Sequence, residues 1–165
     1  MQQNKRQLAE EVYTEMKNLT KITEIIRALQ NDIAVMDAKM ENVKSPTWDG
    51  NGGMTSASDR DHQKLIIIEQ KTDKEIQISH LRKYRKLLVK LIVKNPTEHR
   101  LFLDNVCLYG MDEKKAAKSA GWKGRVETLR NKVIDGLEDV VTEKEYEQMI
   151  NLRNIALSKT SPNRS

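Results

Sequence analysis

A chain of 165 residues with 38% apolar and 32% charged residues can bury only a modest core, which fits one compact domain or a small domain with a helical extension. The net charge of +5 favours an anionic partner, and the longest apolar run, residues 65–68, is far too short to span a membrane. The single cysteine, Cys107, excludes an internal disulfide framework. Together with the opening MQQNKRQL, which lacks signal-peptide character, it predicts a soluble cytoplasmic protein.

The first predicted element is a long helix over residues 4–44. Its apolar residues recur at alternating spacings of four and three, which is a heptad seam. The seam consists of Ile22, Ile26, Leu29, Ile33, Met36, Met40 and Val43. A single helix with this stripe would be unstable in water, so it must pack on a second helix of the same chain or on another copy.

A segment rich in Gly, Ser and Thr, residues 45–59, interrupts the helical pattern and predicts a loop in which Trp48 folds onto the helices. A second long helix is expected over residues 60–93. Its apolar stripe consists of Leu81, Tyr84, Leu88, Leu91 and Ile92. Because the two helices have similar lengths, we expect an antiparallel coiled-coil hairpin over residues 1–94. A parallel dimer through the first helix is the alternative.

After Pro96 the long-helix pattern gives way to short helices, which predict a separate domain over residues 97–157. Thr97 is expected to cap the first short helix, which ends at about Tyr109, where Gly110 stops it. The side chains expected to face inward are Leu101, Phe102, Val106 and Cys107.

Three more helices are predicted in this domain, over residues 113–120, 125–140 and 142–157. Asp112 is expected to cap the first and Gly121 to end it, while Thr142 and Glu145 form a capping box for the third. The tail, residues 158–165, is expected to be disordered. The predicted fold is therefore all-α: a long helical hairpin followed by a small C-terminal domain.

The stretch from residue 107 to residue 140 has the composition of a helix-turn-helix. Small residues permit the close crossing of two short helices, and Gly121 supplies the tight turn between them. The small residues are Ala116, Ala117 and Ala120. On the next helix, apolar positions spaced by three and four share one buried face. These positions are Leu129, Val133, Gly136 or Leu137, and Val140.

The opposite face of that helix carries residue types that read bases. Thr128 and Asn131 can hydrogen-bond base edges, and Glu127 beside them can accept from cytosine. Cations around this face suit contacts with the phosphate backbone. They are Lys114, Lys115, Lys118, Lys123, Arg125, Arg130 and Lys132. The sequence therefore predicts that this helix enters the major groove of double-stranded DNA.

Positive charge is concentrated in the same part of the chain. Residues 82–132 contain 14 Lys or Arg and five Asp or Glu, whereas the rest of the chain contains 15 and 19. A phosphate backbone favours such a concentration because each neutralised phosphate releases counterions. An ordinary helical hairpin with a lysine-rich, solvated surface is the alternative interpretation.

The segment also resembles region four of bacterial sigma factors. The matching residues are Gly110, Ala117, Gly121 and the triplet Thr128, Leu129 and Arg130. The layout of residues 20–140 resembles the RinA/ArpU group of phage transcriptional regulators. This layout consists of a long helix, a Trp-containing loop (SPTWDGNGGM), a second long helix and a sigma-like helix-turn-helix. This resemblance implies regulation of late phage genes in a bacterial host cell. We expect two further partners, RNA polymerase and a second copy of the chain with which the protein would form a dimer.

Two other functions stay open. The motif AAKSAGW is similar to a signature of small terminase subunits, which bind phage DNA for packaging and assemble as rings. A coiled-coil module that binds a host protein would need no DNA contact. These alternatives differ from the regulator in oligomeric state or in their response to DNA.

The sequence contains no motif that indicates an enzyme. His62, His80 and His99 are far apart and have no Cys, Asp or Glu at metal-ligand spacing. A phosphate-binding glycine loop after a strand is absent, and no Ser/His/Asp or Cys/His set is suggested. We therefore expect neither catalysis nor a cofactor or metal.

Overall fold

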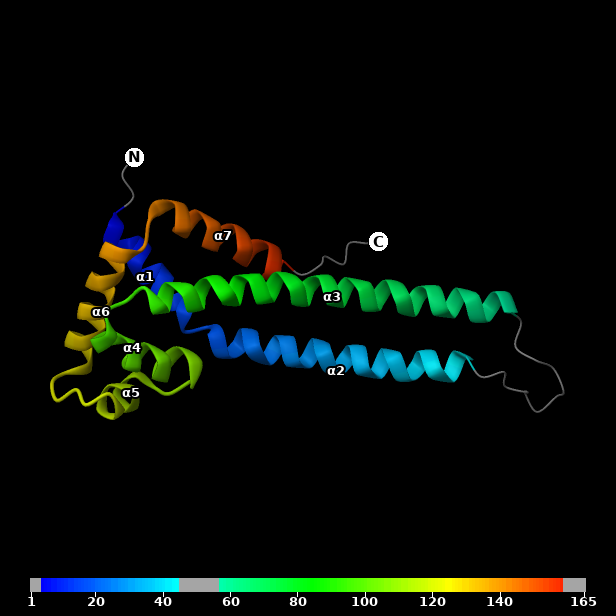
Figure 1. Cartoon of the computed structure of the whole chain (residues 1–165), viewed down its shortest axis with the longest axis horizontal. Coiled ribbons are helices and arrows are strands. Elements are labelled where there is room, and N and C mark those ends of the chain that lie inside the picture. Colours follow the sequence, from blue (N-terminus) through cyan, green and yellow to red (C-terminus); the bar gives the residue numbers. More distant parts are fainter. Residues whose placement is uncertain (1–3, 45–56, 159–165) are drawn as a thin grey trace.

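The computed structural model describes residues 4–44 and 57–158, and all regular secondary structure within these ranges is helical (Figure 1). The predicted all-α class is therefore confirmed. The elements in chain order are α1 (Lys5–Met16), α2 (Leu19–Lys44), α3 (Ala57–Val93), α4 (Thr97–Leu103), the π-helical turn η1 (Asp104–Leu108), α5 (Glu113–Ser119), α6 (Val126–Val140) and α7 (Glu143–Leu157). Trp48, the side chain of Val43 and the tail beyond Ser158 lie outside the described residues. None of the described helices has the length and apolar character of a membrane span.

The predicted single helix over residues 4–44 is wrong, because the chain changes direction at Lys17 and Asn18 and forms two helices (Figure 1). The buried face of α1 packs mainly on α6, whereas α2 packs on α3. The α1 residues on that face are Ala9, Val12, Tyr13 and Met16. Since the two neighbours lie in different directions, the chain must turn between them, and this tertiary demand overrides local helix propensity.

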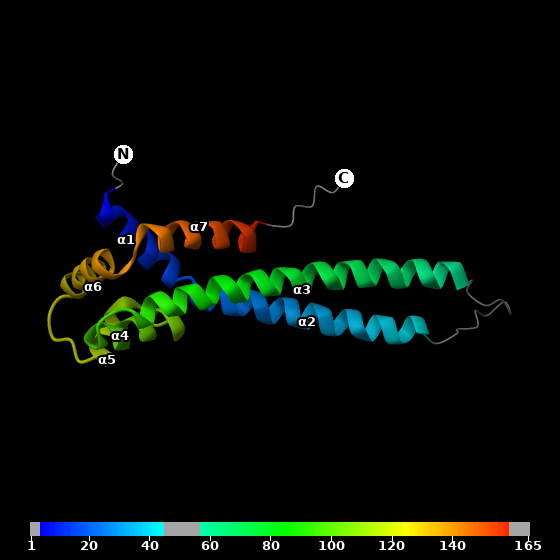
Figure 2. The ribbon, with the colours of Figure 1, turned by 45° about the horizontal axis from the view of Figure 1, so that its top comes forward.

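α2 and α3 lie side by side and antiparallel (Figures 1 and 2). The seam residues Ile22, Ile26 and Leu29 are buried, and the later seam residues Ile33, Met36 and Met40 are half-buried. Ion pairs add to the apolar contacts in this outer part. Lys71 Nζ lies 2.8 Å from Asp37 Oδ1, and Lys74 Nζ lies 3.4 Å from Asp32 Oδ2. The hairpin is therefore held by apolar burial at its inner end and by exposed, weaker pairs further out.

The predicted apolar stripe of α3 lies at the centre of the core, and its burial is confirmed. Its members, each at most 2% exposed, are Leu81, Tyr84, Leu88, Leu91 and Ile92. The helix ends before Pro96, as predicted. The side-chain amide of Asn95 donates a hydrogen bond to the Leu91 carbonyl at 2.8 Å. This bond satisfies one of the carbonyls left free at the helix end.

Two expectations for the next helix are wrong. Pro96 is the N-terminal cap of α4 and no side chain caps the helix, so Thr97 is its first residue and not its cap. Leu101 is 50% exposed, because the inward face begins one residue later, at Phe102. The other predicted inward residues, Val106 and Cys107, are buried. Burial raises the pKa of the Cys107 thiol to about 12, as expected for a small core residue.

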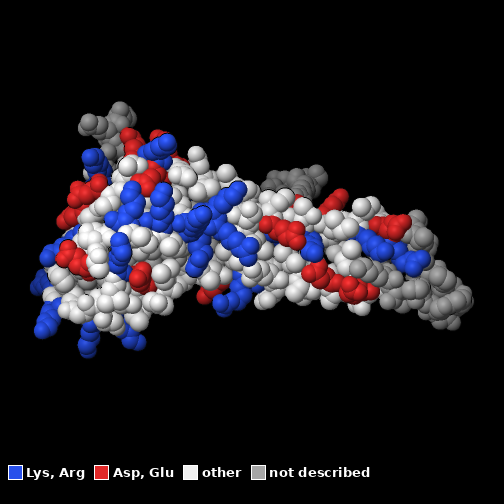
Figure 3. Space-filling model, in the orientation of Figure 1, with Lys and Arg blue, Asp and Glu red and all other residues white. Residues whose placement is uncertain are grey.

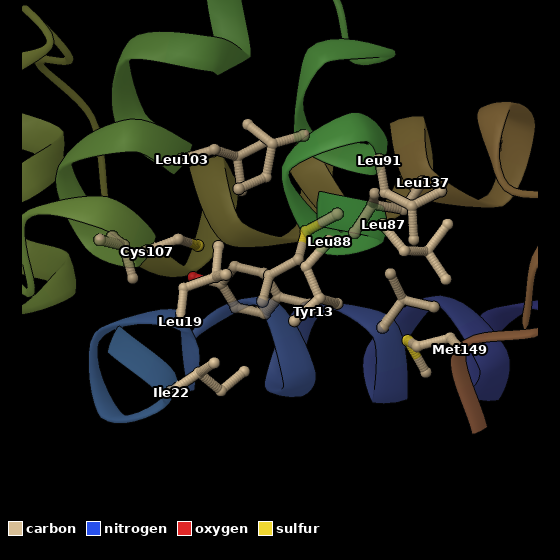
Figure 4. Close-up of a cluster of buried hydrophobic side chains, with 14 of the residues drawn as sticks. Tyr13, Leu19, Ile22, Leu87, Leu88, Leu91, Leu103, Cys107, Leu137 and Met149 are labelled. Atoms are coloured by element: carbon tan, nitrogen blue, oxygen red, sulfur yellow. The ribbon is translucent and has the colours of Figure 1, made fainter. Parts of the chain in front are cut away.

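Helices from both sides of the expected boundary at residues 94–97 share one core (Figure 4). α1 packs along α6, and α7 packs along α3. The buried cluster joins Tyr13 and Leu19 to Leu103, Leu137 and Met149. At this boundary the helices become shorter, but the core continues across it. Independent folding of the two parts stays a prediction.

Carboxylates of α1 add polar links to this core. Glu15, which is 9% exposed, accepts hydrogen bonds from the Tyr84 hydroxyl of α3 and, at 2.8 Å, from Arg153 Nη1 of α7. One turn earlier, Glu11 accepts from the Tyr146 hydroxyl. This bond and burial raise the pKa of Tyr146 to about 12. These bonds fix α1, which in turn supports α6.

Candidate nucleic-acid interface

Local capping and a buried alanine face fix the orientation of α5. Gly110 has a φ of +68°, a conformation that favours glycine, and it ends the preceding turn as predicted. Asp112 then caps α5, since its Oδ1 accepts from the Lys115 backbone N–H at 2.9 Å. Ala116 and Ala117 are buried against the core. The lysines on the other side of the helix are exposed to solvent: Lys114, Lys115 and Lys118.

The turn between α5 and α6 has a defined shape. Gly121 has a φ of +83°, where a side chain would be strained, and this agrees with its predicted place in the turn. Trp122 donates its backbone N–H to Ala117 O at 3.0 Å and its indole N–H to Arg125 O at 2.9 Å. A methyl group added at Gly124 would lie 3.2 Å from Trp122 Nε1, so the chain passes close to the ring. Trp122 therefore anchors the turn, and Lys132 Nζ stacks 5.0 Å from its ring centroid.

α6 buries one face and exposes the other, as its sequence pattern predicts. Leu129, Val133 and Leu137 are at most 4% exposed. The side chains expected to read bases, Thr128 and Asn131, are both exposed. The other predicted site residues with exposed side chains are Lys114, Lys115, Lys118, Lys123, Arg125, Glu127 and Lys132. The predicted base-reading face is therefore accessible.

Arg130 differs from the other predicted site residues because it is half-buried and paired. Its Nε lies 2.5 Å from Glu113 Oε2, which also accepts the Tyr13 hydroxyl at 2.9 Å, and Lys17 Nζ lies 3.8 Å from Glu113 Oε1. Burial opposes ionisation of Glu113, but the hydrogen bonds from Arg130 and Tyr13 outweigh it and lower the pKa of this carboxyl. The pair links α5 to α6, so the geometry indicates a positioning role for Arg130.

Arg6, at the start of α1, belongs to this site although the sequence did not indicate it. It forms an ion pair with Asp135, lies 3.7 Å from Glu138 Oε1, and donates from Nη2 to Asn131 Oδ1 at 3.3 Å. Arg6 thereby offsets carboxylates near the exposed face of α6 and orients the Asn131 amide. No local pattern predicts this contact, because it depends on the turn between α1 and α2.

Charge divides the surface of the α5–α6 segment into two zones. A depression of about 650 Å³ between α5, the turn and the first part of α6 is lined by four cations, together with Glu113 and Glu127. The cations are Lys114, Lys118, Arg125 and Arg130. The second half of α6 is acidic, with Asp135, Glu138 and Asp139. In Figure 3 cations project from the end of the molecule that holds α5 and the turn. An anionic ligand is therefore favoured at the beginning of α6 and disfavoured at its end.

No family model, curated protein or solved structure matches the chain. The resemblances to sigma region four, RinA/ArpU regulators and small terminase subunits therefore stay predictions. The expectation that the chain is not an enzyme also stays a prediction.

Proposed function

We propose that the chain binds double-stranded DNA in a sequence-specific manner through α5, the turn and α6. The observation that carries this proposal is the exposed pair Thr128 and Asn131 at the beginning of α6, beside cations that form no salt bridge within the described residues. These cations are Lys114, Lys115, Lys118, Lys123 and Arg125. In helix-turn-helix complexes, residues near the start of the second helix read base edges while cations fix the register on the backbone.

The proposed roles follow the chemistry of each group. Thr128 and the free NH2 group of Asn131 hydrogen-bond base edges in the major groove, and Glu127 accepts from a cytosine amine. Lys114 and Lys118 of α5 contact one strand, and Lys123 and Arg125 of the turn contact phosphates nearby. The acidic second half of α6 disfavours contact with phosphates, so only the first two turns approach the DNA.

The biological role we propose is regulation of late phage genes in a bacterial host, with RNA polymerase as a further partner. It rests on the resemblance to RinA/ArpU regulators. If the chain binds DNA, the alternative to a transcriptional regulator is a small terminase subunit. A regulator should sediment as a dimer, whereas a terminase subunit should sediment as a ring of many copies.

A second candidate function, binding of another protein, is favoured by the outer part of α3. Three large apolar side chains there share one face of the helix at spacings of three and eight. They are Leu65, Ile68 and Ile76, which are 58%, 47% and 50% exposed. Such a row is typical of a contact surface. A second copy of the chain is the simplest occupant, and a host protein is the alternative.

The proposal is tested by DNA affinity as a function of salt. The wild type should bind a fragment from the phage genome with a steep loss of affinity as salt rises. Lys114→Gln combined with Lys118→Gln should reduce the slope of log affinity against log salt by about 2, and it should weaken binding to all sequences alike. Asn131→Ala should reduce the preference for the specific fragment by roughly 5- to 100-fold.

A matched control removes the same charge elsewhere. Lys39 of α2 and Lys144 of α7 are exposed and lie outside the α5–α6 segment, so Lys39→Gln combined with Lys144→Gln should leave the slope almost unchanged. Equal slopes for the two double variants would contradict the proposed interface. A wild type that ignores DNA even at low salt would favour the protein-binding candidate.

A further inference from the structure

The half of α3 that leads to α4 carries a second group of unpaired cations. No acidic residue occurs between Glu75 and Glu98. Four of the cations in this interval are exposed and form no salt bridge within the described residues. They are Arg82, Lys83, Lys86 and Lys90, and we call them the α3 basic surface. In Figure 3, Lys and Arg gather on the visible face where this half of α3 runs.

The fold does not account for these charges. The opposite side of α3 is buried, with Leu81, Tyr84 and Leu88 fully inside the core, so the cations have no packing role. Other cations of the same interval are engaged: Lys94 Nζ lies 2.6 Å from Glu145 Oε1, and Arg85 Nε donates to Thr23 Oγ1 at 3.2 Å. Like charges one turn apart destabilise a helix, so an uncompensated row has a cost that an external anion would offset.

We infer that the α3 basic surface binds the phosphate backbone of nucleic acid, outside the contacts made by α5 and α6. Arg82, Lys86 and Lys90 follow one another at four-residue spacing, which places a positive charge at about every 6 Å along the helix. A regular row of cations fits a polymer with regular negative charge. This inference rests on the proposed DNA-binding function and adds a second contact region to it.

An acidic lipid surface is the other anionic partner to consider, but the surroundings of the patch disfavour it. Helices that lie on membranes insert exposed apolar side chains next to their cations. Between Gln77 and Ile92, every Leu, Ile and Val of α3 is buried or half-buried, and Val93, which is 52% exposed, is the single exposed apolar side chain beside the row. The α3 basic surface therefore offers charge with only one apolar side chain to insert.

The test compares two triple variants of the full chain. The first is Arg82→Gln, Lys86→Gln and Lys90→Gln, which removes exposed charge and leaves the core intact. The second, a control, is Lys39→Gln, Lys64→Gln and Lys144→Gln, which removes the same charge elsewhere. Binding to a duplex of about 40 base pairs is measured over a range of salt. For the first variant we expect the salt slope to fall by about 2 to 3, with unchanged sequence preference, and for the control we expect little change.

Each other outcome assigns the failure to one of the two proposals. A wild-type slope in the α3 variant, alongside a reduced slope for Lys114→Gln with Lys118→Gln, would overturn the inference and leave the proposed function standing. A reduced slope in the α3 variant alone would support the α3 basic surface and overturn the proposed α5–α6 interface. If the α3 variant binds vesicles rich in phosphatidylserine less well than the wild type does, and its salt slope for DNA is unchanged, the inference would be overturned in favour of a lipid partner.

Discussion

At the scale of single residues, the ion pair between Arg130 and Glu113 decides how α5 and α6 are joined. The sequence predicts that the Arg130 guanidinium contacts a DNA phosphate, but in the structure it donates to the Glu113 carboxylate at 2.5 Å. The same carboxylate also accepts a hydrogen bond from the Tyr13 hydroxyl of α1. Three helices therefore meet at Glu113. The sequence pattern places Arg130 beside the predicted base-reading face, but it does not reveal the partner of Arg130, a carboxylate that lies 17 positions earlier.

Arg130→Ala should lower the free energy of unfolding by about 1 kcal/mol, because it leaves Glu113 without its closest partner. Chemical denaturation of the wild type and the variant measures the effect. Lys115→Ala, which removes an exposed charge from α5, is the control and should change stability by much less than about 1 kcal/mol. An Arg130→Ala variant as stable as the control would show that the pair contributes nothing to stability.

The same pair should make stability depend on pH. Folding lowers the pKa of Glu113, so its ionisation stabilises the fold. This contribution is complete above the usual pKa of glutamate and disappears as the pH falls through the lower pKa of the folded state. Glu113→Gln should therefore be less stable than the wild type at neutral pH, and the difference should shrink as the pH falls below the usual pKa of glutamate. A difference that does not change with pH would contradict this assignment.

Gly121→Ala should destabilise the chain by about 1 kcal/mol, because the φ of +83° is strained for a residue with a side chain. There is space for the added methyl group, with no heavy atom within 4 Å, so backbone conformation is the only expected cause. Gly121→Asn should be milder, since asparagine adopts this conformation more readily than alanine. Thermal unfolding of both variants checks the order, and an alanine variant at least as stable as the asparagine variant would contradict it.

At the scale of whole elements, the sequence predicted that the described elements are helical and where most of them end, but it did not predict the π-helical turn η1. Capping residues succeed because they act locally: the Asp112 cap and the Thr142–Glu145 capping box are both present. The single helix over residues 4–44 fails because the division into α1 and α2 depends on two different neighbours. Thr97 fails as a cap because Pro96 already occupies that position. Most of the local caps are therefore readable from the sequence, whereas the packing of α1 on α6 is not.

The exposed apolar row on the outer part of α3 predicts self-association. Ile68→Gln combined with Ile76→Gln should shift the sedimentation of the protein towards the monomer, because it removes apolar area that a second copy would bury. The control is the single substitution Ile66→Gln, an equally apolar position that is 42% exposed on another side of the helix, to be compared with Ile68→Gln alone. Unchanged sedimentation of the double variant would exclude this face as the contact between copies.

At the scale of the whole molecule, the long helices and the short helices α4 to α7 share one core. The exposed cations form two groups on the surface of the molecule, one on α3 and one on the α5–α6 segment. The concentration of positive charge between Arg82 and Lys132 is evident in the sequence. Which of these cations are paired within the protein is not, because pairs such as Lys94 with Glu145 and Arg130 with Glu113 depend on the fold. Arg6 is the clearest example of a residue that only the fold brings to the site, since it reaches α6 from the other end of the chain.

Contact between the first two turns of α6 and DNA can be followed by amide chemical shifts during titration with a specific duplex. The largest changes should fall in α5, the turn and the first half of α6, including Thr128 and Asn131. Smaller changes are expected at Arg82, Lys86 and Lys90. Changes confined to the second half of α6, or the absence of changes at saturating DNA, would contradict this contact.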